Sequence, residues 1–197
     1  MWFKLAFVVA FTSAVAVATT TARRATRRHG GTLNQLSHEV RGLLVVRAVL
    51  GLVFYATLIA WLFWPRALAW TYFPVPAAMR WLGVALLLPA LAFFAWSFRS
   101  LGVNYRGGVG LYDAHELVTT GPYLWIRHPI YMAFIGIMLL VLPLSANWVL
   151  SLSGLLLVLS IAAARIPTEE RQLHERFGPA WESYRERTGR LVPRLRR

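Results

Sequence analysis

The chain alternates long apolar runs with short polar connections, and this pattern predicts helices that span a membrane. Five apolar segments approach the length of about 20 residues that a helix needs to cross a bilayer. The predicted spans are Trp2–Ala18, Leu43–Trp64, Trp81–Phe98, Ile130–Leu144 and Trp148–Ala164. We therefore expect an all-α integral membrane protein with five transmembrane helices.

The last two spans are separated by only a few residues. Pro143 and Asn147 in this short connection favour a tight turn. We therefore expect residues 130–164 to form one helical hairpin whose two open ends lie on the same side of the bilayer. Pro89 lies inside the third span, where we expect it to kink the helix.

A further helix is predicted after the hairpin, on the cytoplasmic side, over Thr168–Tyr184. Pro167 followed by two glutamates is typical of a helix N-terminus, and Gly178-Pro179 should break or kink the helix midway. The helix carries one apolar stripe, which either packs on the membrane surface or on the loop at 99–129, or also walls a ligand site. The stripe consists of Leu173, Phe177, Trp181 and Tyr184.

Composition agrees with a membrane protein and narrows the possible chemistry. The 197 residues are 57% hydrophobic and 15% charged, whereas soluble domains have about 25% charged residues. The chain contains no cysteine, which excludes disulfides, thiolate metal sites and a cysteine nucleophile. At this length we expect a single domain over 1–197, with three spans in 1–98 and a loop, the hairpin and the tail in 99–197.

The net charge of +13 does not indicate nucleic-acid binding, because the basic residues cluster just outside the apolar spans. With five spans, 18 of the 21 Lys and Arg residues fall on one side, and only Lys4, Arg66 and Arg80 fall on the other. The positive-inside rule then places the N-terminus outside and the C-terminus in the cytoplasm. A cleaved signal peptide at the N-terminus is the alternative, but arginines follow the first segment at Arg23, Arg24, Arg27 and Arg28.

Polar residues stand at both open ends of the predicted hairpin. Residues 121–131 read Gly-Pro-Tyr-Leu-Trp-Ile-Arg-His-Pro-Ile-Tyr, and Glu169 and Glu170 follow the exit. Ionisable groups at a membrane edge are costly and usually functional, although interface anchoring and helix capping would also explain them. Arg165, four residues before Glu169, could pair with a substrate carboxylate. A glutamate could accept hydrogen bonds from ribose hydroxyls or balance a positively charged cofactor.

These residues, in this order and spacing, resemble the signature of the isoprenylcysteine carboxyl methyltransferases. The resemblance rests on Arg127-His128-Pro129-Ile130-Tyr131, the apolar hairpin and Glu169-Glu170. It extends upstream through residues 115–123 and downstream to Val192-Pro193, and so covers roughly residues 100–195. Trp181 stands where a tyrosine is common in the family.

The resemblance implies an S-adenosylmethionine-dependent methyltransferase that acts on the carboxylate of a prenylated cysteine or a similar lipid-tailed molecule in the bilayer. Arg165 matches the arginine that faces the substrate, and Gly108 lies in a less clearly matching part of the cofactor loop. No metal is implied. The implied cofactor contacts are His115, Glu116, Leu117, Val118, Tyr123, His128, Pro129, Ile130, Tyr131 and Glu169.

Three other functions are compatible with the same residues. The scaffold could methylate a phospholipid amine, with His128 or a glutamate as the base, or a small thiol. Membrane sterol reductases resemble the family in their C-terminal half but use NADPH, and are normally longer. A membrane scaffold without enzymatic activity would bind neither cofactor.

Overall fold

The structure is a computed structural model that describes residues 2–29, 41–105 and 115–194. Within these ranges it consists of helices and short connections, and the only β-type pairing is in two isolated bridges. The predicted all-α class is therefore confirmed. The α-helices are α1 (Trp2–His29), α2 (Arg41–Phe63), α3 (Ala77–Leu101), α4 (Pro129–Ser145), α5 (Trp148–Phe177) and α6 (Pro179–Arg187). Short 3-10 turns are η1 (Pro65–Thr71), η2 (Gly102–Asn104) and η3 (Gly121–Leu124).

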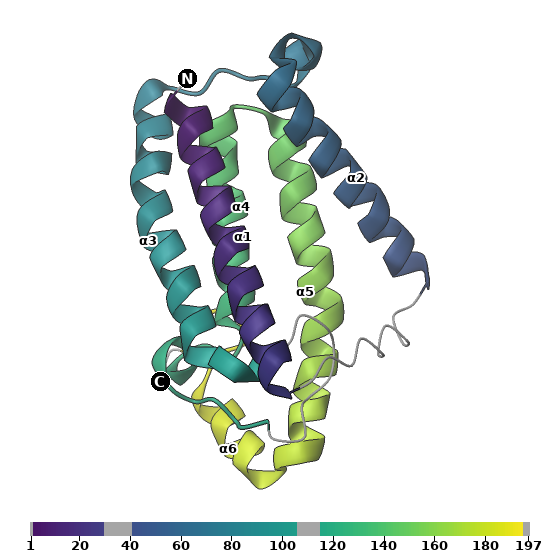
Figure 1. Ribbon diagram of the computed structural model, residues 1–197, viewed down its shortest axis with the longest axis vertical. Coiled ribbons are helices and arrows are strands. Elements are labelled where there is room, and N and C mark those ends of the chain that lie inside the picture. Colours follow the sequence, from purple (N-terminus) through teal and green to yellow (C-terminus); the bar gives the residue numbers. More distant parts are fainter. Residues whose placement is uncertain (1, 30–40, 106–114, 195–197) are drawn as a thin grey trace.

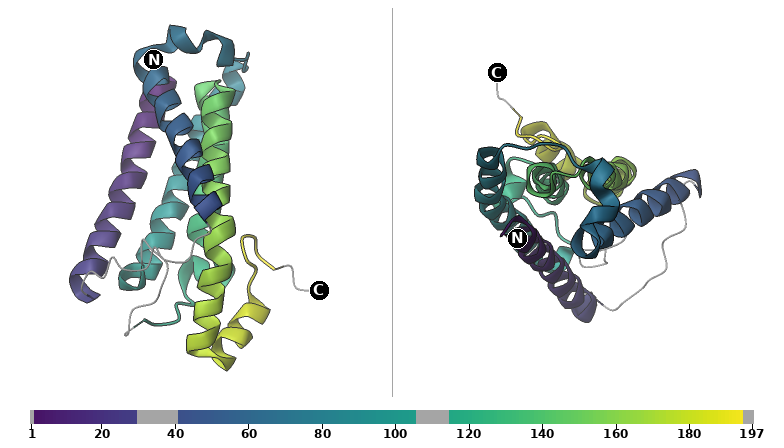
Figure 2. Two further views of the ribbon diagram at one scale, coloured as in Figure 1. Left: turned by 90° about the vertical axis from the view of Figure 1, so that its right-hand side faces the viewer. Right: turned by 90° about the horizontal axis from the view of Figure 1, so that it is seen from above.

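Helices α1 to α5 run up and down in one bundle, with α6 at the end where α5 finishes (Figure 1). Helix α5 packs between α2 and α4, α4 packs against α3, and α1 contacts α3 and α4 (Figure 2). Among the described residues, α1, α2, α3 and α5 are long and apolar enough to cross a membrane, whereas α4 is a shorter apolar helix of 17 residues.

The predicted hairpin of the last two spans is confirmed, and its turn is built from buried polar contacts. Ala146 adopts the left-handed conformation with φ of 53° and ends α4. Asn147 then caps α5, because its Oδ1 accepts a hydrogen bond of 3.0 Å from the backbone N of Leu150. Its Nδ2 donates to Oγ1 of Thr71, and both side chains are fully buried. These bonds fix where α5 begins and hence the register of the polar residues at its other end.

The predicted separate tail helix is wrong in its starting point. Pro167 lies inside α5, which continues without interruption to Phe177. A proline removes one backbone hydrogen bond, and here Oγ1 of Thr168 donates to the carbonyl of Ala164 within the same turn. The 30 residues of α5 extend roughly 45 Å, so the helix continues well beyond its apolar part.

The break predicted at Gly178-Pro179 is confirmed. Gly178 has φ of 48° and ψ of −120°, a conformation that L-residues rarely adopt, and Pro179 begins α6. Glu169 and Glu170 therefore lie on a continuous helix, two turns or so before this break, and not at a helix N-terminus.

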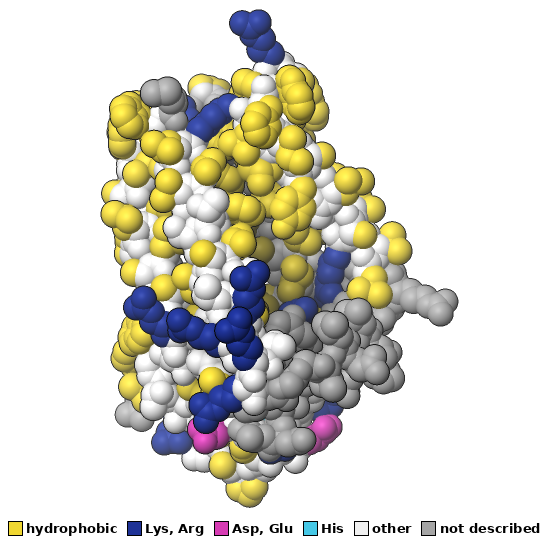
Figure 3. Space-filling view, viewed as in Figure 1, with side chains coloured by type: hydrophobic (Ala, Val, Ile, Leu, Met, Phe, Trp, Pro, Cys, Tyr) yellow, Lys and Arg dark blue, Asp and Glu magenta, His cyan; other side chains and the backbone are white. Residues whose placement is uncertain are grey.

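Charge is distributed unevenly along the bundle. Figure 3 shows hydrophobic side chains over the upper part of the molecule and most of the visible Lys and Arg in the lower half, with a few at the top. The arginines Arg23, Arg24, Arg27 and Arg28 lie on the last turns of α1, which continues eleven residues beyond the predicted end at Ala18. We call the end that carries these arginines, η3 and α6 the polar end. The side of the membrane that it occupies stays a prediction.

Candidate active site

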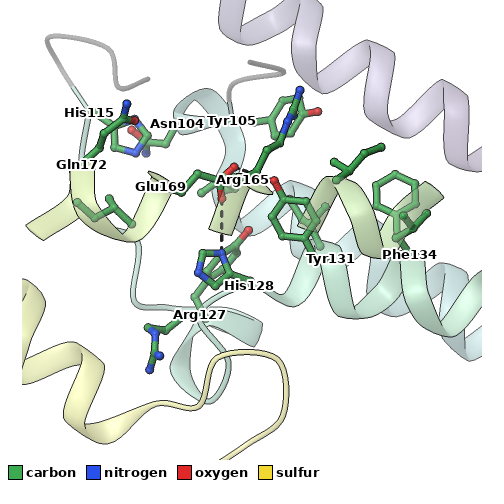
Figure 4. A pocket seen from close by; sticks show the side chains of 16 residues that line it. Asn104, Tyr105, His115, Arg127, His128, Tyr131, Phe134, Arg165, Glu169 and Gln172 are labelled. Carbon is green, nitrogen blue, oxygen red and sulfur yellow. Dashed lines mark hydrogen bonds and ion pairs between the residues drawn. The ribbon is translucent and has the colours of Figure 1, made fainter. Parts of the chain in front are cut away.

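A cavity of about 360 Å³ lies at the polar end of the bundle, between the end of α3, the start of α4 and α5 (Figure 4). Its walls come from segments far apart in the sequence, which the hairpin and the end of α3 bring together. The lining residues are Leu101, Asn104, Tyr105, His115, Tyr123, Arg127, His128, Ile130, Tyr131, Phe134, Val158, Ile161, Arg165, Glu169, Gln172 and Leu173.

Helix α5 contributes one continuous face to this cavity. Val158, Ile161, Arg165, Glu169 and Gln172 recur at spacings of three or four residues, which places them on one side of a helix. From Val158 to Gln172 the helix rises roughly 21 Å. The cavity wall thus changes along α5 from aliphatic side chains to a cation, a carboxylate and then an amide.

The turn η3, which begins at Gly121 and precedes α4, contributes Tyr123 to the cavity wall. Gly121 has φ of +61°, and a Cβ there would lie 2.4 Å from Oγ of Ser100. Tyr123 in this turn is buried, and its carbonyl accepts a hydrogen bond of 2.7 Å from the hydroxyl of Tyr184. Trp181 is also buried. Of the stripe's four members, Tyr184 therefore binds the loop that precedes α4, and Leu173 alone lines the cavity.

His128 lies between the two glutamates of α5. Its Nδ1 is 3.6 Å from Oε2 of Glu169, and its Nε2 is 3.3 Å from Oε1 of Glu170; Figure 4 marks the contact with Glu169 by a dashed line. Burial by itself lowers the pKa of His128, but the hydrogen bonds and charges of Glu169 and Glu170 outweigh it, so that the pKa is raised from 6.5. The two glutamates thus stabilise the protonated form of the imidazole.

Tyr131, on the first turn of α4, fixes the other carboxylate oxygen of Glu169. Its hydroxyl donates a hydrogen bond of 2.7 Å to Oε1 of Glu169. His128 and Tyr131 together hold Glu169 in one orientation, and the glutamate side chain stays 28% exposed. A carboxylate held in this way can still accept hydrogen bonds from a ligand in the cavity.

Glu170 is absent from the cavity wall and binds the C-terminal segment. Its Oε1 lies 3.0 Å from Nε of Arg127, and its Oε2 lies 2.6 Å from Nη2 of Arg190. The backbone completes the connection, because Arg127 N donates to Gly189 O and His128 N donates to Arg190 O. We call residues 188–192 the C-terminal strap. Burial raises the pKa of Glu170, but the bonds from His128, Arg190 and Arg127 more than compensate, and its pKa lies well below the usual range.

The structure brings together most, but not all, of the site residues predicted from the sequence. Seven line the cavity: His115, Tyr123, His128, Ile130, Tyr131, Arg165 and Glu169. Glu116, Leu117, Val118 and Pro129 are not part of the cavity wall. The backbone N of Glu116 instead donates a 3.0 Å hydrogen bond to Oδ1 of the buried Asn104, and Pro129 begins α4. Gly108 lies outside the described residues. The roles of all these residues stay predictions.

Several cavity residues were not singled out from the sequence. Gln172 follows Glu169 by three residues within the predicted tail helix, so helical spacing alone could have placed the two on one face. Asn104 and Tyr105 follow the third span, where no periodic pattern identifies them. Phe134 follows Tyr131 by three residues on α4.

A second cavity of about 270 Å³ lies within the apolar part of the bundle and has a largely apolar lining. It is bordered mainly by α1 and α4, with Tyr55 of α2 and Leu87 of α3. Phe134 lines both cavities, so the two are neighbours. Phe134 is therefore shared by the walls of the polar cavity and the apolar cavity.

Comparison with known proteins identifies relatives for the half of the chain that holds the polar cavity. Residues 81–175 match the isoprenylcysteine carboxyl methyltransferase (ICMT) family. Over 79 residues, the chain is 37% identical to the protein-S-isoprenylcysteine O-methyltransferase of Schizosaccharomyces pombe, a match that covers 40% of this chain and 34% of the yeast protein. Over 96 residues it is 29% identical to the uncharacterized protein YpbQ of Bacillus subtilis, covering 48% of this chain and 57% of YpbQ. The chain thus spans only part of the length of each of these two relatives.

The fold has a solved counterpart. The structure of the eukaryotic intramembrane Ras methyltransferase ICMT matches 95% of this chain and 67% of its own, with a TM-score of 0.54 and 19% identity. The structural likeness therefore covers nearly the whole bundle, beyond the residues 81–175 that match in sequence. The resemblance predicted from the sequence is therefore confirmed, and this chain is a relative of the isoprenylcysteine carboxyl methyltransferase family in the sequence of residues 81–175 and in its fold.

Proposed function

We propose that this protein is an S-adenosylmethionine-dependent methyltransferase that acts on the carboxylate of a prenylated cysteine or a similar lipid-tailed molecule. One observation carries the proposal: Arg165 and Glu169 lie one helical turn apart in a cavity that shares Phe134 with an apolar cavity. A polar reaction site and a space for a lipid chain are thus adjacent. The match to the methyltransferase family supports the reaction type.

The cavity residues fit the proposed cofactor. Glu169 offers a carboxylate that His128 and Tyr131 orient, and such a group accepts hydrogen bonds from ribose hydroxyls or balances a sulfonium charge. Gln172 adds a buried side-chain oxygen that accepts no hydrogen bond within the described part of the protein. The cavity wall therefore offers hydrogen-bond acceptors, which suit a ligand that carries several donors and a positive charge.

The methyl acceptor would occupy the part of the cavity that lies nearer the apolar part of α5. Arg165 lies one turn nearer the apolar part of α5 than Glu169, where its guanidinium can bind a carboxylate through two parallel hydrogen bonds. The lipid chain of the acceptor would then pass Phe134 into the apolar cavity. Binding the chain in this cavity holds the carboxylate in place and excludes water from the site.

When bound, S-adenosylmethionine would supply an electrophilic methyl group for an acceptor oxygen, with the sulfonium sulfur keeping the electron pair of the broken carbon–sulfur bond. The acceptor carboxylate is already ionised at neutral pH, so the protein has no proton to remove. His128 therefore need not act as a base. The contribution of Arg165 and Glu169 is to align the two reactants.

Two measurements test this function. Calorimetry of the detergent-purified protein should detect binding of S-adenosylmethionine and S-adenosylhomocysteine but not of NADPH. Transfer of a labelled methyl group should then occur to a farnesylated cysteine with a free carboxylate, and not to the same molecule with a carboxamide. Transfer only to a phospholipid amine or a thiol would contradict the proposed acceptor, and NADPH binding alone would contradict the proposed reaction.

A further inference from the structure

Gln172 belongs to the wall of the polar cavity and carries a hydrogen-bonding group that is not used within the described structure. It lines the cavity, and its Oε1 atom is buried without a hydrogen-bond partner in the described structure. A buried polar atom left without a partner costs about 1–3 kcal/mol, and native proteins contain few of them. A ligand that donates a hydrogen bond at this place would remove that cost.

The position of Gln172 limits which part of a ligand it can contact. It lies at the end of the cavity away from Phe134, where Figure 4 shows it beside His115 and Asn104. Arg165 and Glu169 occupy the turns of α5 between Gln172 and the apolar part of the helix. If the lipid-tailed acceptor lies toward Phe134, Gln172 faces the end of the cofactor that is remote from the acceptor.

The chemistry of a side-chain amide suits an adenine base. A glutamine presents one acceptor and one donor side by side, and adenine presents its 6-amino donor beside a ring-nitrogen acceptor. This pairing holds whichever way the amide is turned in the free protein, since rotation by 180° only exchanges the two atoms. Leu173, the next residue on α5, also lines the cavity and provides apolar surface for a planar ring.

We propose that Gln172 determines specificity for the adenine base, by accepting a hydrogen bond from its 6-amino group and donating one to the neighbouring ring nitrogen. The inference rests on the proposed function, because it takes the cofactor to be an adenosyl compound. It adds a contact to the residues implied by the family resemblance, and it concerns binding, which can be measured without turnover.

The test compares two ligands by calorimetry on the detergent-purified full chain. One is S-adenosylhomocysteine, and the other is its analogue in which hydrogen replaces the 6-amino group. The wild type should bind the amino compound at least about tenfold more tightly, as a bidentate glutamine–adenine pair discriminates. Gln172→Met, of similar length and without hydrogen-bonding groups, should bind the two ligands equally.

Two further variants separate recognition from structural damage. Gln172→Glu keeps an acceptor for the 6-amino group and should retain part of the preference. Glu175→Met makes a similar replacement at an exposed position on α5 outside the cavity wall and should behave as the wild type. A preference that persists in Gln172→Met, or no preference in the wild type, would overturn the inference while leaving the proposed function intact. No binding of S-adenosylhomocysteine by the wild type would overturn both.

Discussion

Tyr131 donates a 2.7 Å hydrogen bond from its hydroxyl group to Oε1 of Glu169, joining residues 38 positions apart in the sequence. The whole hairpin of α4 and α5 lies between them. This bond and the contact of His128 with Glu169 hold together the two motifs on which the family resemblance rests. The first prediction concerns this bond.

Replacing Tyr131 by phenylalanine removes the hydroxyl and keeps the ring. If Glu169 binds the cofactor, Tyr131→Phe should weaken S-adenosylhomocysteine binding by about tenfold, because a hydrogen bond to a charged group contributes roughly 1.5–3 kcal/mol. Calorimetry measures the change, and thermal unfolding in detergent checks that the fold is kept. Unchanged affinity in a well-folded variant would show that the orientation of Glu169 does not matter for binding.

Replacing Arg165 and replacing Glu169 should affect two different properties, methyl transfer and cofactor affinity. Arg165→Ala should abolish methyl transfer and leave S-adenosylhomocysteine affinity nearly unchanged, whereas Glu169→Ala should weaken that affinity. The reason is that we assign the guanidinium to the acceptor carboxylate and the carboxylate to the cofactor. Transfer of labelled methyl and calorimetry report the two properties. Arg171→Ala, at an exposed position on α5, is the control and should retain both. Normal transfer by both site variants would refute the assignment.

Replacing Glu170 should lower the free energy of unfolding more than replacing Arg190, its partner on the C-terminal strap. Glu170→Gln leaves Arg127, whose side chain is 8% exposed, without its carboxylate, and we expect a loss of about 2–4 kcal/mol. Arg190→Ala removes a side chain that is 56% exposed, so its loss should stay below about 1 kcal/mol. Unfolding in detergent, with amide exchange at Arg127 and Gly189, measures both effects. Equal losses would contradict the burial argument.

The stability of the protein should fall as pH rises past neutrality. Because the pKa of His128 is raised in the folded protein, its stabilising contribution is complete below the unfolded value of 6.5 and is lost as pH rises through the higher folded value. Melting temperatures from about pH 5.5 to about pH 9 should show this decline in the wild type and a smaller one in His128→Asn. Glu170, whose pKa is lowered, acts in the opposite direction, and its contribution is lost only in acid. Identical slopes for the wild type and His128→Asn would exclude His128 as the origin.

Close packing of α5 can be tested with a matched pair of glycines. A Cβ at Gly154 would lie 2.8 Å from Cε2 of Phe54 and 2.9 Å from Sδ of Met138, so Gly154→Ala should destabilise the bundle by about 1–3 kcal/mol. A Cβ at Gly51 on α2 would meet no atom of the described residues within 4 Å, so Gly51→Ala should be neutral or stabilise the helix by up to about 1 kcal/mol. Thermal unfolding of both variants ranks them. A stable Gly154→Ala protein would mean that Phe54 and Met138 move aside readily.

The sequence by itself determined the class of the protein, the spans and the order of the polar motifs. Apolar length predicts spans directly, because lipid leaves the backbone no partner outside its own helix. The turn at Asn147 and the break at Gly178 were also predictable, since an N-cap and a glycine with positive φ act locally. Local signals failed at Pro167, where a proline and two glutamates indicated a helix start that a continuous helix overrode.

Only the tertiary structure decided which polar groups share the cavity and what each one faces. Glu169 and Glu170 are adjacent in the sequence, yet consecutive residues of a helix point about 100° apart, so Glu169 lines the cavity and Glu170 binds the C-terminal strap. Gln172 came to the cavity wall because α5 runs through Pro167. The sharing of Phe134 by the two cavity walls likewise depends on how α1, α4 and α5 pack, which no local pattern of residues encodes.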